Sequence, residues 1–248
     1  MVYVVIKRYL TWRFGSAFWG GVILKKKMLS IHIQVETTDS PRPSIFYLCG
    51  KRIFDVFCGT FGIILVVVTS ILLLPFCLFG RNKGPLFFKQ TRIGLNGKKF
   101  EIYKFRSMVV NAEEVLRRSS SLYDKYVENN YKLPSGEDPR ITRLGAFLRR
   151  TSFDELPQFI NILKGDMSMI GPRPVVEDEL SEYGDRADDL LCAKPGAMGL
   201  WQASGRSNVG YPERAYLELQ YVNNRSFHND IIILFKNIVA ICKKDGAF

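Results

Sequence analysis

The sequence predicts an α/β protein, mainly helical with a small sheet, in which a membrane-inserted N-terminal helix precedes a compact cytosolic domain. Three observations predict this fold class. Residues 56–79 contain no charged side chain, and residues 86–89 and 99–105 have the composition of short strands on either side of a glycine-containing turn. Helical patterns follow at residues 111–118, 154–163, 212–222 and 229–243. The polar stretch 119–137 predicts a loop.

Composition divides the chain into three parts. Residues 1–50 form a variable segment whose apolar stretch at 14–24 is too short to span a bilayer. Whether this segment is partly disordered or lies on a membrane surface stays open, as does the use of Met28 as the start. Residues 51–82 contain the membrane helix, and residues 83–248 form the cytosolic domain.

The uncharged run predicts membrane insertion because a helix of that length exceeds the roughly 30 Å of a hydrocarbon core. Basic residues flank both of its ends: Lys51 and Arg52 precede it, and Arg81 and Lys83 follow it. Positive charge marks the cytoplasmic side of a membrane segment. Two basic flanks therefore make a re-entrant segment as plausible as a span. Pro75 lacks a backbone N–H and predicts a kink.

Charge and cysteine content limit the class of protein. Lys and Arg number 35 against 24 Asp and Glu, and the formal net charge of +11 implies anionic partners such as nucleic acid, acidic lipid or phosphorylated substrates. The five cysteines are odd in number and lack the close spacing of a zinc or redox motif, which favours a reducing compartment. Two histidines argue against a His-based triad or metal site.

Asp154 and Glu155 lie among basic residues at the expected start of a helix. One reading is helix capping, since Ser152 and Glu155 fit a capping box. Pro157 moves the expected helix start to Asp154, because proline is tolerated in a first turn. The other reading is catalytic. A helix N-terminus attracts phosphate, an ionised Asp can attack a phosphoryl group, and a neighbouring carboxylate can hold Mg²⁺.

Arginines surround the acidic pair and suit phosphate oxygens, although a solvated basic surface is the alternative. Arg149 and Arg150 precede the pair, and Arg173 stands between two prolines that stiffen the turn. Trp201 fits either a stacking platform for a base or sugar ring or a core aromatic. The apolar face of residues 229–243 favours core packing, with the bilayer interface as the alternative.

Several motifs follow one another in a characteristic order: Lys51-Arg-Ile-Phe-Asp55, Lys89-Gln-Thr-Arg-Ile-Gly94, Tyr103-Lys-Phe-Arg-Ser-Met108, Arg150-Thr-Ser-Phe-Asp-Glu-Leu-Pro-Gln158, Lys164-Gly-Asp-Met167, Gly171-Pro-Arg-Pro174 and Lys194-Pro-Gly196 with Gly199-Leu-Trp-Gln202 and Ser204-Gly-Arg206. With the apolar run, this order resembles the monotopic phosphoglycosyl transferases, often called bacterial sugar transferases. The resemblance covers residues 51–248.

The resemblance implies transfer of a sugar-1-phosphate from a UDP-sugar to a polyprenyl phosphate with release of UMP. The residues of the last motif resemble those of members that transfer a hexose-1-phosphate. It implies that Asp154 forms a covalent aspartyl intermediate and that Glu155, with Asp154, binds Mg²⁺. The implied substrate-binding residues are Lys104, Arg150, Arg173 and Arg206. Such a reaction is the first membrane step of bacterial exopolysaccharide, capsule or O-antigen synthesis.

The resemblance also implies partners and a location. The partners are the UDP-sugar, the polyprenyl phosphate and membrane lipid, with no nucleic acid and a homodimer left open. The location is the bacterial inner membrane, with the catalytic domain on the cytoplasmic face. Alternatives are transfer of an acetamido-sugar-1-phosphate and a non-catalytic membrane-tethered basic binding protein.

The chain departs from the family pattern at two places within residues 51–248. Many members have a re-entrant helix that breaks at a central Ser-Pro, whereas this chain has Thr69-Ser70 there and its proline at Pro75. Met198 replaces a common threonine. The position of the break, and re-entrance itself, therefore stay open.

Overall fold

The computed structural model describes residues 43–128, 133, 136–205 and 209–243, which belong to one structural unit, Ser40–Phe248. The expectations for residues 1–42, including Met28, lie outside the described residues. The α-helices are α2 (Ile45–Leu73), α3 (Ala112–Arg117), α4 (Ser120–Glu128), α5 (Arg143–Thr151), α6 (Gln158–Lys164), α7 (Ala187–Leu191), α8 (Leu200–Ala203), α9 (Glu213–Asn223) and α10 (Phe227–Lys243). The strands are β1 (Phe87–Ile93), β2 (Lys99–Phe105), β3 (Ser168–Ile170) and β4 (Gly196–Met198). Short 3₁₀ segments cover Leu74–Leu78, Gly80–Asn82, Leu95–Gly97, Phe153–Glu155 and Glu177–Arg186.

The mainly helical α/β class is confirmed by two small sheets among many helices. β1 and β2 form the predicted antiparallel hairpin, with Phe87 opposite Phe105 and positive φ angles at Asn96 and Gly97 in its turn. β3 and β4 pair in parallel. The second sheet is absent from the prediction because three-residue strands are too short to carry an alternating pattern.

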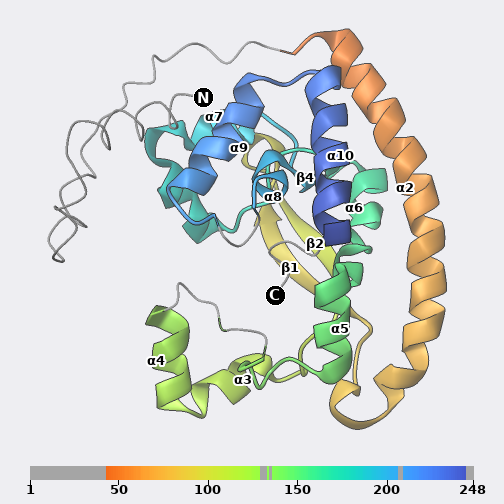
Figure 1. Ribbon diagram of the computed structural model, residues 1–248, viewed down its shortest axis with the longest axis vertical. Coiled ribbons are helices and arrows are strands. Elements are labelled where there is room, and N and C mark those ends of the chain that lie inside the picture. The colour runs from red at the N-terminus through yellow and green to blue at the C-terminus, as the bar shows by residue number, and fades with distance from the viewer. Residues whose placement is uncertain (1–42, 129–132, 134–135, 206–208, 244–248) are drawn as a thin grey trace, which may run out of the picture. The chain divides into compact units, whose positions relative to one another are not determined.

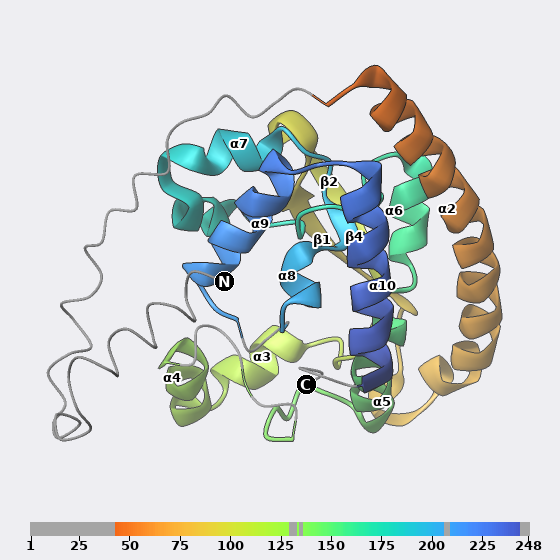
Figure 2. The same ribbon diagram turned by 45° about the horizontal axis from the view of Figure 1, so that its top comes forward.

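The main core lies where the hairpin and β3 meet helices α6, α9 and α10, and α2 packs against its outer side. Its fully or nearly buried side chains are Phe100, Ile102, Ile162, Met167, Met169, Ile170, Ala193, Tyr221, Val222 and Ile233. In both views α6 lies between α2 and the β1–β2 hairpin (Figures 1 and 2), and α6 contacts both of them. The hairpin and α6 thus form one layer, and β2 contacts the Phe153–Glu155 turn, which carries the acidic pair.

Helix α2 packs against this layer along one stripe of its surface. The residues buried on that stripe are Asp55, Gly59, Gly62, Val66 and Leu73. A Cβ at Gly62 would lie 2.1 Å from the Phe159 ring, and one at Gly59 would lie 2.6 Å from Leu163. The two glycines therefore allow α2 to approach α6 more closely than larger residues would.

The rest of the α2 surface is exposed and apolar. Ile45–Leu78 forms a stretch long and apolar enough to cross a membrane, and an 18-residue window within it has a mean hydropathy of 2.8. Exposed side chains on it include Phe57, Phe61, Ile64, Val68, Ile71 and Leu72. Such a surface favours a membrane location for the chain, as its sequence predicts.

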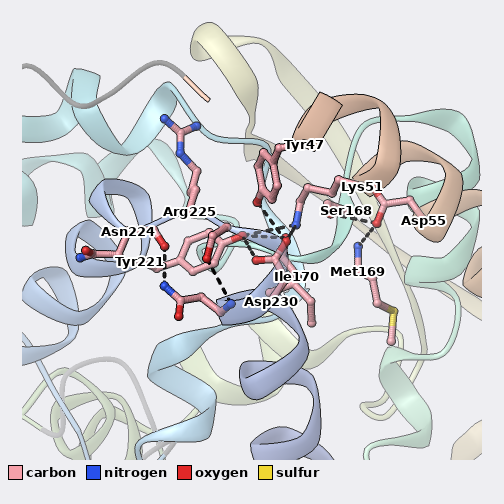
Figure 3. Close-up of polar contacts among 12 residues, drawn as sticks. Tyr47, Lys51, Asp55, Ser168, Met169, Ile170, Tyr221, Asn224, Arg225 and Asp230 are labelled. Carbon is pink, nitrogen blue, oxygen red and sulfur yellow. Dashed lines mark hydrogen bonds and ion pairs between the residues drawn. The ribbon is translucent and has the colours of Figure 1, made fainter. Parts of the chain in front are cut away.

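A buried polar network fastens the start of α2 to the C-terminal helices (Figure 3). The Lys51 ammonium lies 2.5 Å from the Asp230 carboxylate, and the Tyr47 hydroxyl donates to the same oxygen at 2.9 Å. Tyr221 donates to the other carboxylate oxygen at 2.8 Å and accepts from Lys51 at 3.3 Å. Because each charge is paired and hydrogen-bonded, the network is compatible with its burial.

Two further α2 side chains form hydrogen bonds with β3 and with the end of α6. Asp55 accepts hydrogen bonds from the Ser168 hydroxyl at 2.9 Å and the Met169 N–H at 2.7 Å (Figure 3). Arg52 donates to the carbonyls of Ile162 and Leu163 at 2.7 and 2.8 Å, which caps the C-terminal end of α6. Helix α2 is thereby held to the domain by polar contacts as well as by packing.

The structure corrects two expectations about helices outside the acidic segment. Pro75 does not kink a longer α-helix; α2 ends at Leu73, and the proline lies in the 3₁₀ turn that follows. Thr69-Ser70 lies inside the continuous helix, where the Ser70 hydroxyl donates to the Val66 carbonyl. The predicted loop 119–137 contains α4, whose first turn is capped by the Ser119 hydroxyl.

Candidate active site

A cavity of about 960 Å³ is lined in part by residues of the β1–β2 hairpin and of α6. Its wall includes charged and polar side chains that come from segments far apart in the sequence: Lys104, Arg149, Asp154, Glu155, Gln158, Arg173 and Gln202. A smaller recess continues from the cavity and shares Lys104, Glu155 and Arg173 with it. The predicted acidic pair and two of the predicted basic residues therefore meet in one place.

The acidic pair lies in a short 3₁₀ turn between two helices, so the expected helix start at Asp154 is wrong. Helix α5 ends at Thr151 and is capped by Ser152, whose φ of 59° is left-handed. Backbone hydrogen bonds from Glu155 to Ser152 and from Leu156 to Phe153 then close the turn. Helix α6 begins only after Pro157. Pro157 has no N–H to donate to the Phe153 carbonyl, which accepts from Leu156 instead. The Ser152 side chain makes no capping hydrogen bond.

Asp154 is held as a buried carboxylate on the cavity wall, where it is 9% exposed. Burial, followed by repulsion from Glu155, raises the pKa of Asp154 to about 6, while Lys104 and Arg149 oppose that rise. A carboxylate with few stabilising contacts and two cations near it is well suited to react with, or to bind, a group that approaches from the cavity.

Glu155 differs from Asp154 because its carboxylate forms a direct ion pair with a lysine. Its carboxylate lies 2.7 Å from the Lys104 ammonium, and its side chain is 37% exposed. Lys104 comes from β2, whose backbone is fixed by pairing with β1. The hairpin therefore sets the distance between this lysine and the acidic pair.

Arg149, rather than Arg150, reaches the cavity. The Arg149 Nε donates to the Ser107 hydroxyl at 2.9 Å, and burial lowers the pKa of its guanidinium. Gly145 makes this approach possible, because a Cβ there would lie 1.8 Å from the Ser107 carbonyl oxygen. Arg150 is exposed on α5 and is not among the residues that line the cavity.

Arg173 is positioned through both its backbone and its side chain. Its backbone N–H donates to the Glu218 carboxylate at 3.1 Å, and its guanidinium lies 5.4 Å from the centre of the Trp201 ring. The buried Nε of Arg173 has no hydrogen-bond partner among the described residues. Trp201 is buried and donates to the Val209 carbonyl, so it serves here as a core aromatic that supports an arginine.

Three buried charged residues near Arg173 were missed by sequence reasoning. Arg92 lines the recess, and burial together with repulsion from Arg173 and Arg214 lowers its pKa to about 10. Arg214 lies 4.6 Å from the Trp201 ring centre. Burial raises the pKa of Glu218 to about 7. Arg92 belongs to the motif at residues 89–94 and could have been found from the sequence. Arg214 and Glu218 belong to no such motif.

The last predicted substrate residue, Arg206, lies outside the described residues. Among the residues that the structure describes, there is no group of three or more His, Cys, Asp or Glu side chains that could hold a metal ion. Mg²⁺ needs fewer protein ligands when a substrate phosphate completes its shell. Asp154 and Glu155 supply two adjacent carboxylates of the right chemistry, so the residues fit that ion.

Comparisons with known proteins identify the relatives of this chain. A family model described as bacterial sugar transferase matches residues 46–244. Undecaprenyl-phosphate galactose phosphotransferase of Salmonella typhimurium is 45% identical over 201 residues, which cover 80% of this chain and 41% of that protein. UDP-galactose-lipid carrier transferase of Erwinia amylovora has the same identity and the same two coverages.

A third relative is similar along most of its own length. Exopolysaccharide production protein ExoY of Rhizobium meliloti is 42% identical over 200 residues, which cover 80% of this chain and 88% of that protein. By contrast, the chain spans about two-fifths of the Salmonella and Erwinia relatives. The resemblance seen in the motifs is confirmed by the family match, and the chain belongs to the bacterial sugar transferase family.

Proposed function

We propose that this protein transfers a sugar-1-phosphate from a UDP-sugar to a polyprenyl phosphate and releases UMP. The observation that carries the proposal is the buried Asp154 carboxylate, which faces a cavity walled by Lys104, Arg149 and Arg173. A cationic cavity suits the two phosphates of a nucleotide sugar. The names of the Salmonella and Erwinia relatives include undecaprenyl phosphate, galactose and a lipid carrier.

In the first step, an Asp154 carboxylate oxygen attacks the sugar-bearing phosphorus of the UDP-sugar. A phosphorus–oxygen bond to the aspartate forms, and the bond from that phosphorus to the bridging oxygen breaks. UMP leaves with the bonding electron pair. Arg149 and Arg173 stabilise negative charge on the phosphate oxygens, and Lys104 contributes from the hairpin.

In the second step, a phosphate oxygen of the polyprenyl phosphate attacks the same phosphorus. The bond from phosphorus to Asp154 breaks, and the carboxylate is regenerated. The product is a polyprenyl diphosphate sugar. Asp154 needs no proton in either step, because it enters and leaves the cycle ionised.

Mg²⁺ is the proposed cofactor, and Asp154 and Glu155 are the residues that would hold it. When bound, it neutralises charge on the phosphate oxygens as the transition state develops. Glu155 also contacts Lys104, so the same carboxylate fixes the lysine on the cavity wall. Arg150 and Arg206 stay predictions as further substrate contacts, the first with an exposed side chain.

The proposed location is the bacterial inner membrane, with the domain on the cytoplasmic face, where nucleotide sugars are made. The packing of α2 supports a one-sided insertion, in which the helix is continuous from Ile45 to Leu73 and the chain returns to the domain after it. Lys51, near its start, and Leu73, at its end, are both packed against the same folded domain. If both ends contact one domain, both ends lie on the domain's side of the membrane.

The transferred group is proposed to be a hexose-1-phosphate, and the galactose in the names of two relatives supports this choice. An acetamido-sugar-1-phosphate is the alternative within the same reaction. The product would enter exopolysaccharide, capsule or O-antigen synthesis as its first lipid-linked sugar. ExoY is named for exopolysaccharide production, which supports that place in a pathway.

The test uses purified full-length protein with Mg²⁺, radiolabelled UDP-galactose and undecaprenyl phosphate. We expect labelled lipid and UMP from the unmodified chain and neither from Asp154→Asn. Full UMP release by that variant would remove Asp154 as the nucleophile. A binding protein without catalysis would give no UMP with any UDP-sugar, and labelled lipid from UDP-N-acetylgalactosamine alone would favour the acetamido alternative.

A further inference from the structure

One part of the cavity wall is apolar and has no use in the chemistry described above. Its side chains come from α2, from β1 and from the loop that joins β2 to α3: Leu65, Phe88, Met108, Val109 and Val110. They offer no hydrogen-bond donor to a bound molecule. We call this set of five residues the apolar arm.

The apolar arm begins beside the cationic groups of the site. The hairpin register sets Phe88 directly opposite Lys104. Arg106 then joins the two chain segments that form the arm, since its Nε donates to the Pro85 carbonyl at 2.7 Å and its Nη1 to the Met108 carbonyl at 3.0 Å. The arm and Lys104 therefore line one cavity, together with Arg106 itself.

Three side chains of the arm are exposed in the part of the chain that the structure describes. Phe88 is 47% exposed, Leu65 is 52% exposed and Val110 is 64% exposed. Neighbouring apolar side chains left in water on a cavity wall mark a surface that binds an apolar group. Leu65 also belongs to α2, so the arm reaches the helix whose outer face is the membrane-facing surface of the domain.

We infer that the apolar arm binds the first isoprene units of the polyprenyl phosphate, with the lipid phosphate held near Lys104 and Arg149. The inference rests on the proposed function and adds to it a binding site for the lipid chain. The acceptor is charged at one end and hydrocarbon beyond it, and the wall likewise places an apolar residue, Phe88, opposite the cationic Lys104. Uridine and a hexose carry many polar groups that the arm would leave without hydrogen bonds.

The test separates the two steps of the reaction. Phe88→Gln and Val110→Gln make the arm polar without adding a charge that would repel either phosphate. Both side chains are exposed, so the substitutions should leave the fold intact. Leu95→Gln is the matched control, because Leu95 is an exposed apolar residue of the hairpin turn that does not line the cavity.

UMP released in a single turnover from UDP-galactose without lipid reports the first step. Steady-state turnover with undecaprenyl phosphate reports the second. We expect each arm variant to release UMP as the unmodified chain does and to raise the KM for undecaprenyl phosphate about tenfold, the size expected for one lost apolar contact. Methyl phosphate, an acceptor without a hydrocarbon chain, should discharge the intermediate equally well in all variants.

An unchanged KM for undecaprenyl phosphate in the double variant Phe88→Gln/Val110→Gln would overturn the inference. A raised KM for UDP-galactose with an unchanged lipid KM would also overturn it and would assign the arm to the nucleotide sugar. Loss of UMP release from the unmodified chain would instead contradict the proposed function. The two failures are therefore distinguishable.

Discussion

Asp154 shows at the scale of one residue how a buried carboxylate weakens the fold that holds it. Its pKa is raised from 3.8 to about 6, chiefly by burial, so the folded chain binds a proton more tightly than the unfolded chain. The ionised carboxylate therefore costs stability above pH 6. That cost shrinks as the pH falls from about 6 to about 4, where both states become protonated.

Asp154→Asn should consequently abolish UMP release and stabilise the protein. A shift of this size corresponds to about 1–3 kcal/mol at pH 8. The measurement is thermal unfolding of both proteins in detergent with EDTA at pH 8 and pH 4.5. We expect a higher melting temperature for the variant at pH 8 and a smaller gain at pH 4.5. An equal gain at both pH values would contradict the raised pKa.

Arg149 and Arg150 form a natural matched pair, since they are adjacent in sequence and differ in environment. Arg149 lines the cavity and donates to Ser107, whereas Arg150 is exposed. Arg149→Ala should lower kcat/KM for UDP-galactose about 100-fold, the effect of losing one charged contact to a phosphate. Arg150→Ala should change it less than about threefold. Equal losses would place both arginines on the substrate.

The residue scale also shows where sequence reasoning stopped. It singled out the acidic pair, Lys104 and Arg173, which the structure brings to one cavity. The sequence motif at residues 150–158 favoured Arg150 over Arg149 as a substrate contact. Which of the two arginines faces the cavity depends on the orientation of α5 about its axis, which the motif does not reveal. Glu218 could not have been found, because its contact with Arg173 joins residues 45 positions apart.

At the scale of elements, the contact between α2 and α6 depends on glycine. The Cβ of an alanine at position 62 would lie 2.1 Å from the Phe159 ring. Gly62→Ala should therefore destabilise the protein by about 1–3 kcal/mol through overpacking, although alanine favours helix formation. Thermal unfolding in detergent measures the effect.

The control for this prediction is a double-mutant cycle. Phe159→Ala alone leaves a cavity, and Gly62→Ala combined with it should cost less than the sum of the two changes. Strict additivity would show that the two side chains do not meet. Val67→Ala, on the exposed side of α2, should change stability little.

Element types were predicted better than element ends. Strand β2 and helices α3, α9 and α10 lie close to their predicted ranges because composition and periodicity are local signals, whereas β1 extends to Ile93, beyond the predicted end at Lys89. The acidic segment was predicted as the start of a helix because neither the left-handed Ser152 nor the 3₁₀ turn has a sequence signature. Short elements such as β3 and β4 exist only through their mutual pairing.

At the scale of the whole molecule, one-sided insertion makes a prediction about topology. Ser44 precedes α2 and Lys83 follows it, and both are exposed. Ser44→Cys and Lys83→Cys, each in a chain whose other cysteines are replaced by serine, should react with a membrane-impermeant maleimide only in inside-out vesicles. Labelling of the two positions from opposite sides would show that α2 spans the membrane.

The Arg52 and Asp55 contacts have a consequence for efforts to obtain a water-soluble enzyme by shortening the chain. Without α2, the Leu163 carbonyl and the Met169 N–H would lose these partners, and Phe159 and Leu163, which lie against Gly62 and Gly59, would be uncovered to water. Exposing apolar surface costs about 25 cal/mol per Å², and the net stability of a domain is only about 5–15 kcal/mol. Helix α2 is therefore part of the folding unit, and its removal would destabilise α6 and the Phe153–Glu155 turn that precedes α6.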